Sequence, residues 1–228
     1  MSTMETGDRA AFIGRLRERA ALGTPENLAH PLPGPIDGVP FAVSDRLDPS
    51  DLVGSFVRNA TGAKAVVHEV DAATVDDPAV IEILVALVER HGVHRIVVSN
   101  EPEAQAVAAL LTPMGITALP VSKDASADAD LGITSAMAGL ATTGTVVQHS
   151  GQAGGRTASL LPPVHLCVLP ASRIVASTAE VLRGFGSVDL PSNIALITGP
   201  SRSGDIEQII ALGVHGPLVV EVLLLKQA

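Results

Sequence analysis

DPAVIEILVALVERHGVHRIVVSNEPEAQAVAALL, residues 77–111, is the stretch that decides the fold. Its first part, up to Gly92, has the apolar spacing of an amphipathic helix, and Pro78 suits the first turn of that helix. Residues 93–99 are then β-branched and apolar, as in a buried strand, and a second helical segment starts at Glu101. A helix, a strand and a helix in direct succession indicate a parallel sheet covered by helices.

The same alternation continues on both sides of this stretch. Between residues 129 and 175, short strand-like runs with little helical periodicity predict a β-hairpin or meander inserted into the sheet. The fold class we expect is therefore α/β, with a mostly parallel sheet. The further predicted helices are 51–62, 178–186 and 203–213, and the further predicted strands are 63–70, 115–120, 164–169, 192–198 and 218–225.

The first 50 residues differ from the rest of the chain. A short basic amphipathic helix around Phe12 and Leu16 is followed by a connector rich in proline and glycine. We expect two regions, an N-terminal helix with its connector at 1–50 and one domain at 51–228.

Composition excludes several classes of function. The net charge is −9, which opposes non-specific binding of nucleic acid, and only 2% of residues are aromatic, which disfavours base stacking. The apolar runs fall short of the roughly 20 residues that a membrane span needs. The N-terminal stretch lacks the apolar core of a signal peptide, so we expect a cytoplasmic protein.

Cys167 is the only cysteine of the chain and lies within the apolar run 164–169. We interpret it as a buried structural thiol. A single cysteine excludes a disulfide within the chain and an iron–sulfur cluster held by this chain alone. The histidines lack the spacing of known metal motifs. We therefore expect no metal and no cofactor bound by this chain alone.

The loop GPSRSGDIE, residues 199–207, is the first candidate ligand site. It joins a predicted strand to a predicted helix, and α/β folds bind ligands in such loops. Backbone N–H groups at a helix start hold carboxylate or phosphate, and an arginine adds a bidentate contact. The candidate residues here are Gly199, Ser201, Arg202, Asp205, Glu207 and His215, the last of which follows the helix.

The same residues are also compatible with a capped helix that binds nothing. Asp205 and Glu207 lie in the first turn of the predicted helix, where their carboxylates complement the helix dipole and repel an anion. His215, close to the helix C-terminus, complements the dipole at the other end, and we favour a structural role for it. A ligand site and a cap both remain open.

Residues 143–159 form the second candidate site. Glycines in this segment allow close approach of the backbone to a ligand, and the hydroxyl groups and an arginine suit an oxyanion. The alternative is a hairpin in which the glycines only make the turns. The candidate residues are Thr143, Gly144, Thr145, Gly155, Arg156 and Ser159.

The segments ATTGTVVQHSGQAGGRTASLLPPVHLCVL (141–169) and ITGPSRSGDIEQIIALGVHGP (197–217) resemble the LUD-domain family, in its lactate-utilization protein C group. The second segment is the more specific, with its GPSR, DIE and GVHGP elements. The resemblance implies a fold similar to the NagB/RpiA/CoA-transferase group, a three-layer α/β/α sandwich with an inserted β element. It also implies an accessory role in L-lactate oxidation, with cysteine-rich iron–sulfur proteins as partners and a small carboxylate or phosphate as ligand.

One position departs from the family pattern. Thr142 stands where family members commonly have a glutamate, and a threonine cannot serve as the base or nucleophile that a glutamate provides. The sequence therefore leaves open whether the chain is an enzyme. The alternative to an accessory subunit is a stand-alone enzyme of the same fold group that acts on a phosphorylated or carboxylate substrate.

Overall fold

The computed structural model of the chain describes residues 47–151, 156–185, 191–204, 210–212 and 216–227. The N-terminal helix and most of the connector predicted for region 1–50 lie outside these residues. In the described part of the chain, none of the helices combines the length and the apolar content that crossing a bilayer requires.

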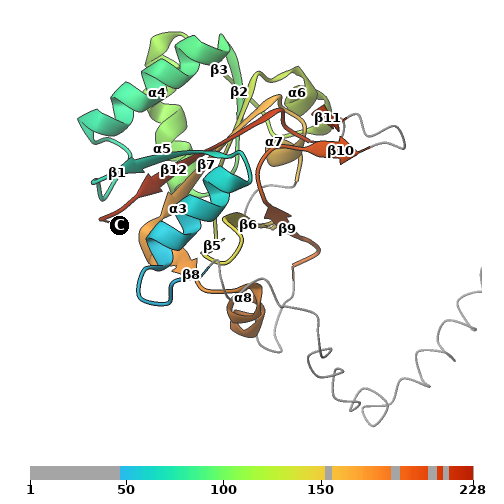
Figure 1. The fold of residues 1–228 in the computed structure, drawn as a ribbon. Coiled ribbons are helices and arrows are strands. Elements are labelled where there is room, and N and C mark those ends of the chain that lie inside the picture. Colours follow the sequence, from blue (N-terminus) through green and yellow to red (C-terminus); the bar gives the residue numbers. More distant parts are fainter. Residues whose placement is uncertain (1–46, 152–155, 186–190, 205–209, 213–215, 228) are drawn as a thin grey trace, which may run out of the picture. The chain divides into compact units, whose positions relative to one another are not determined.

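A six-stranded sheet forms the centre of the domain (Figure 1). All of its neighbouring strands run parallel, so the predicted α/β class with a mostly parallel sheet is confirmed. Its inner strands are buried on both faces, as the unbroken apolar runs predicted. In spatial order the strands are β1 (Val66–Val70), β12 (Val219–Leu225), β7 (Val164–Pro170), β4 (Leu131–Ser135), β2 (Arg95–Val98) and β3 (Thr117–Leu119).

Two helices, α4 (Pro78–His91) and α5 (Pro102–Leu111), cover one face of this sheet. The Asp77 carboxylate accepts a hydrogen bond from the Ala79 N–H at 2.9 Å at the start of α4, and Gly92 ends it in the left-handed conformation. The helix predicted from Pro78 and Gly92 is therefore confirmed. Its apolar stripe packs on the sheet through Val80, Leu84 and Leu87 with Ile96, Leu166 and Leu223.

The opposite face is covered by α3 (Leu52–Gly62), by a second sheet and by two short helices, α6 (Lys123–Asp128) and α7 (Thr157–Leu160). Phe56 and Ala60 of α3 are fully buried and share a core with Cys167 and other residues of β7 and β12. The parallel sheet is thus covered on both faces, and its core is built almost entirely of aliphatic side chains.

The second sheet corrects one prediction. The predicted hairpin exists as β5 (Ala138–Leu140) and β6 (Thr145–His149), but it is not inserted into the parallel sheet. It belongs to a separate four-stranded sheet with β8 (Ile174–Val175) and β9 (Ile194–Ile197). The predicted strand 192–198 therefore contributes to this second sheet. The short helix predicted next to it is α8 (Thr178–Gly184).

A further prediction is wrong. The helix predicted over residues 203–213 is contradicted at the positions that the structure describes, because β10 (Arg202–Gly204) and β11 (Ile210–Leu212) pair antiparallel, with Arg202 opposite Leu212. Residues 205–209 and 213 of that prediction lie outside the described residues. Short apolar runs fit a strand as well as a helix, and strand pairing decides here. The helix start that was to hold an anion beside Arg202 is therefore absent from the described residues of this segment.

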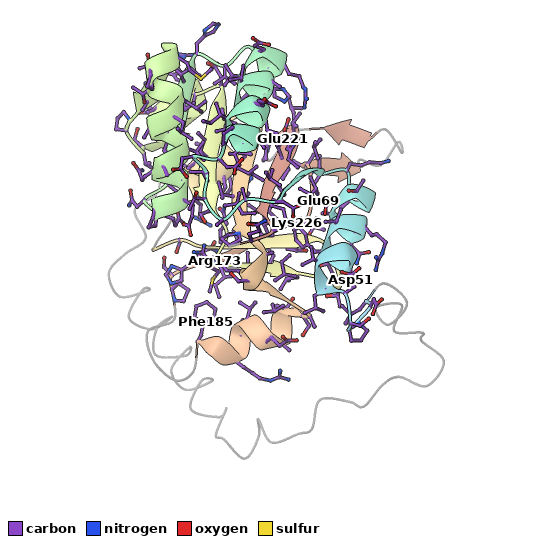
Figure 2. The ribbon with its side chains drawn as sticks, turned by 90° about the vertical axis from the view of Figure 1, so that its left-hand side faces the viewer. Asp51, Glu69, Arg173, Phe185, Glu221 and Lys226 are labelled. Atoms are coloured by element: carbon purple, nitrogen blue, oxygen red, sulfur yellow. The ribbon has the colours of Figure 1, made fainter. Side chains whose placement is uncertain are left out.

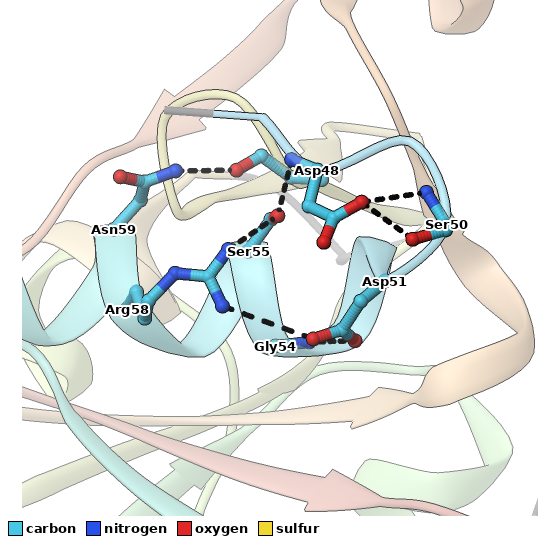
Figure 3. A network of polar contacts seen from close by, with 8 residues as sticks. Asp48, Ser50, Asp51, Gly54, Ser55, Arg58 and Asn59 are labelled. Atoms are coloured by element: carbon cyan, nitrogen blue, oxygen red, sulfur yellow. Dashed lines mark hydrogen bonds and ion pairs between the residues drawn. The ribbon is translucent and has the colours of Figure 1, made fainter. Parts of the chain in front are cut away.

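Helix α3 begins in a network of polar contacts (Figure 3). The Asp51 carboxylate accepts a hydrogen bond from the Gly54 N–H at 2.7 Å, which caps the helix. One turn later Ser55, fully buried, accepts hydrogen bonds from the Asp48 N–H and from the Arg58 guanidinium. Near the helix end, the Asn59 amide donates to the Ala141 carbonyl at 2.7 Å. These contacts fix α3 against the loop that precedes β6.

Two glycines pack closely against the backbone at the C-terminal end of α3. Gly144 has a φ of 65°, and a Cβ there would lie 1.9 Å from the backbone nitrogen of Ala60. Gly199 has a φ of 74°, and its Cβ would lie 2.2 Å from the Ala63 carbonyl oxygen. Both positions require glycine, because the conformation is left-handed and the space is filled by the helix backbone.

Gly144→Ala should lower the free energy of unfolding by about 2–5 kcal/mol, since it combines a left-handed alanine with a clash against α3. Chemical denaturation measures the loss. Gly62→Ala is the control, because a Cβ at Gly62 meets nothing within 4 Å; this helical glycine should gain or lose less than about 1 kcal/mol. Equal stabilities for both variants would contradict the packing described for Gly144.

Candidate functional site

The order of the parallel strands creates a switch point between β2 and β4. After β2 the chain continues to β3 at one edge, whereas after β4 it continues to β7 on the other side. The segments that leave the carboxyl ends of β2 and β4 therefore diverge. In open α/β sheets such a point opens a crevice, and ligands bind there.

A pocket of about 610 Å³ lies at this switch point. Its walls come from the segments that directly follow β2, β4, β6 and β7. Its volume lies in the range of small-molecule sites. The lining residues are Asn100, Glu101, Pro102, Glu103, Met137, Gly151 and Arg173.

Arg173 is the basic side chain of this pocket, and three hydrogen bonds hold it. It ends the short 3₁₀ turn after β7, η3 (Ala171–Arg173). Its Nη1 donates to the Ser135 hydroxyl at 3.1 Å and to the Ala136 carbonyl at 3.0 Å, and its Nη2 contacts the Glu103 carboxylate. The side chain remains 37% exposed. Because a guanidinium has five N–H donors, two remain for a ligand.

Two carboxylates lie beside Arg173. Glu103, in the first turn of α5, forms the ion pair through Oε1, while its Oε2 is buried and has no hydrogen-bond partner in the described structure. Glu101 accepts a hydrogen bond from the buried Ser99 hydroxyl. The pocket thus offers a fixed guanidinium for a carboxylate, and next to it Glu103 Oε2 is a buried acceptor without a donor.

A buried polar cluster lies between the parallel sheet and β6. The Thr134 hydroxyl is 2.8 Å from Nε2 of His165, and the Gln148 amide contacts Thr134. His165 is fully buried, its Nδ1 has no partner in the described structure, and burial lowers its pKa to about 4. The imidazole is therefore neutral at pH 7, and the cluster contributes hydrogen bonds and no charge.

Cys167 belongs to the same cluster, and its thiol is unreactive. It is fully buried, as predicted, and burial raises its pKa to about 12. The Gln148 amide lies 3.8 Å from its sulfur. Since the thiolate is the nucleophile and the metal ligand, this cysteine suits neither role.

Part of the residue set predicted from the sequence comes together at the end of α3. The hydroxyls of Thr143 and Thr145 are 2.6 Å apart, and Thr145 is 2.7 Å from the Thr198 hydroxyl. Gly144 and Gly199 flank this chain of hydroxyl groups, and their close approach is to α3. The C-terminal end of a helix carries the negative end of its dipole, which disfavours an anion at this place.

The other predicted residues are dispersed or lie outside the described structure. Arg156 is exposed and precedes α7, and the buried Ser159 donates a hydrogen bond to its carbonyl. The Ser201 N–H donates to the Pro217 carbonyl at 3.0 Å. A ligand-binding role for these residues stays a prediction. Arg202 is placed by its backbone in β10, while Gly155, Asp205, Glu207 and His215 lie outside the described residues.

A second buried carboxylate was missed by sequence reasoning. Glu221 of β12 is fully buried, and its two oxygens lie 2.6 Å from Nε2 of His68 and 2.6 Å from Nε2 of His91. The His91 side chain is only 16% exposed. Burial would raise the pKa of Glu221, but hydrogen bonds and charge from both histidines outweigh it and lower the pKa. Glu221 is an acidic residue inside the apolar run 218–225, and this position was the sequence signal for a buried carboxylate.

Neither this cluster nor the pocket forms a metal site. Among the residues that the structure places, no three His, Cys, Asp or Glu side chains are arranged to hold a metal ion.

Comparison with known proteins shows which family this chain resembles. The family model of the LUD domain matches residues 117–225. Lactate utilization protein C of Exiguobacterium sp. is 31% identical over 183 residues, which are 76% of this chain and 77% of the relative. Lactate utilization protein C of Halalkalibacterium halodurans is 44% identical over 95 residues, and that match spans only 41% of the relative's length.

A solved structure shares the fold. The DUF162 family protein from Deinococcus radiodurans superposes with a TM-score of 0.55 and 20% sequence identity, over 79% of this chain and 99% of that chain. This similarity supports the α/β fold alone.

The buried His165 predicts a loss of stability in acid. Its pKa is about 4 in the folded protein and about 6.5 when unfolded, so between these values only the unfolded chain binds the proton. The free energy of unfolding is therefore unaffected by this histidine's protonation above pH 6.5, and it decreases as the pH falls from 6.5 toward 4. The loss should be about 3 kcal/mol, from about 1.4 kcal/mol per pH unit.

Urea denaturation of the wild-type protein and of His165→Gln between pH 7 and pH 4 measures this loss. The difference in unfolding free energy between the two proteins should shrink by about 3 kcal/mol toward pH 4. His94→Gln, at an exposed position, keeps His165, so its unfolding free energy should fall toward pH 4 as that of the wild-type protein does. Parallel pH profiles for wild type and His165→Gln would show that His165 is not the titrating group.

Proposed function

The chain belongs to the LUD-domain family, and on that premise we propose that it serves lactate utilization as a subunit without a redox centre of its own. Its role is to bind and orient the small-molecule ligand in the pocket between β2, β4 and β7. Cysteine-rich iron–sulfur proteins are the partners that carry the electrons. The names of its relatives support a role in lactate utilization. The chemistry of its own residues supports the assignment of the redox centres to partner proteins.

The residues of this chain do not fit an iron–sulfur cluster. Such clusters are held mainly by cysteine thiolates, commonly four of them. Cys167 is the only cysteine in the 228 residues, and its buried thiol has a pKa of about 12. Oxidation of lactate to pyruvate removes two electrons and needs a carrier, which the proposal assigns to the partners.

The observation that carries the ligand assignment is the ion pair between Arg173 and Glu103 Oε1, next to which Glu103 Oε2 is buried without a partner. A 2-hydroxy carboxylate such as lactate has an anionic end for the two remaining guanidinium donors and a hydroxyl group to donate to Glu103 Oε2. The carboxylate and the hydroxyl group of the ligand would then both have hydrogen-bond partners, and so would the free donors of Arg173 and the unpaired oxygen of Glu103.

The charges of the pocket favour this ligand over a phosphate ester. Glu101 and Glu103 supply two negative charges against the single positive charge of Arg173. The three groups sum to a charge of −1, so a phosphate dianion meets about twice the repulsion that a monocarboxylate meets. The hydroxyl group of the acid adds a hydrogen-bond donor without adding charge. Of the two ligand classes expected from the sequence, the carboxylate is the better match.

The proposal is tested by reconstitution. The chain is co-expressed with cysteine-rich iron–sulfur proteins of lactate utilization, and L-lactate-dependent reduction of an artificial electron acceptor is measured with and without it. We expect activity only when this chain is present. Arg173→Ala should reduce kcat/KM by about 10- to 100-fold, the worth of a charged hydrogen bond.

Arg183→Ala is the matched control, because Arg183 is an exposed arginine of α8 outside the pocket. Since Arg173 also ties η3 to α5, thermal unfolding checks that Arg173→Ala is folded, and Arg173→Lys supplies a variant that keeps the charge. Partner proteins that are fully active without this chain would refute the proposed role. Unchanged kinetics in a folded Arg173→Ala variant would refute the ligand assignment.

A further inference from the structure

A second cavity adjoins the pocket. It has a volume of about 270 Å³ and lies where α8 packs on the second sheet. It shares two lining residues, Met137 and Arg173, with the larger pocket. Among the residues that the structure describes, its lining comprises Met137, Ala138, Arg173, Val175, Glu180, Val181, Gly184 and Phe185.

The two cavities differ in chemistry. The larger one carries Asn100, Glu101 and Glu103, whereas the walls of the smaller one are mainly aliphatic and aromatic. Figure 2 shows Phe185 at the end of α8, below Arg173 in that view. The exposed Glu180 is the one acidic residue among the described lining residues of the smaller cavity. The larger cavity is therefore a polar chamber and the smaller one an apolar chamber, and the two adjoin at Met137 and Arg173.

The shared residues suit a partition between the chambers. Arginine combines an apolar stem with a charged head, so Arg173 can contribute methylene groups to one chamber and its guanidinium to the other. Met137 is unbranched and flexible, and its backbone N–H is held by the Val147 carbonyl at 2.9 Å. Its side chain can shift without movement of the strand that carries it.

We infer that the two cavities form one site for an amphipathic 2-hydroxy carboxylate whose carbon chain is longer than that of lactate. The carboxylate and hydroxyl groups bind Arg173 and Glu103, and the alkyl or aryl chain passes Met137 into the apolar chamber. Lactate, which has only a methyl group, leaves that chamber empty. The inference rests on the proposed function for the head group and adds the substrate class for the tail.

Isothermal titration of the full chain with lactate, 2-hydroxybutyrate and 2-hydroxyhexanoate tests this inference. Each methylene that enters the apolar chamber should tighten binding about fourfold, which corresponds to about 0.8 kcal/mol. Gly184→Phe is the blocking variant, because Gly184 lines the chamber and a Cβ there meets nothing within 4 Å. It should abolish the gain from longer chains and leave lactate affinity unchanged.

Gly62→Phe is the control, since Gly62 has equal free space but lies in α3, away from both cavities. It should keep the full chain-length series. If lactate binds and longer chains bring no gain in the wild-type protein, the apolar chamber is not part of the site and the proposed function stands. If none of the three acids binds, the assignment of the head group to Arg173 and Glu103 falls, and this inference falls with it.

Discussion

The strand order of the parallel sheet is the constraint on which the rest of the structure depends. Because β2 leads to β3 and β4 leads to β7, the segments after these two neighbouring strands leave in opposite directions. Glu103 at the start of α5 and Arg173 after β7 can then meet across the opening, although 70 residues separate them in the sequence. The ion pair and the hydrogen bonds of Arg173 to Ser135 and Ala136 connect the segments that follow β2, β4 and β7. The site is thus a consequence of topology, with its chemistry supplied by a few side chains.

Much of the fold could be predicted from the sequence because it is encoded locally. Helix α4 is specified by Asp77, Pro78 and Gly92 within one short segment, and the inner strands are unbroken aliphatic runs. The failures occur where a long-range partner decides. Residues 210–212 fit a helix by their spacing, but pairing with 202–204 makes them a strand. The hairpin of β5 and β6 was recognised, yet its choice of sheet depends on β8 and β9, which come later in the chain.

The candidate site was harder to predict than the fold for the same reason. Glycines and hydroxyl groups near residue 144 were interpreted as a backbone approach to a ligand, but the backbone that Gly144 approaches is that of α3. The residues next to Arg173 in the sequence carry no signal of a site, because its partners Glu103 and Ser135 reach it only in the folded chain. Glu221 is similar, because His68 and His91 come from other elements. Local patterns specify elements, whereas charge pairs across elements specify the site.

The central claim is that the opening between β2, β4 and β7 holds the ligand. A crystal structure of the full chain soaked with L-lactate tests this most directly. The account predicts a lactate carboxylate hydrogen-bonded to the Arg173 guanidinium, with the lactate hydroxyl directed to Glu103. Lactate bound instead at the hydroxyl groups of Thr143, Thr145 and Thr198, with the pocket beside Arg173 containing only solvent, would contradict it.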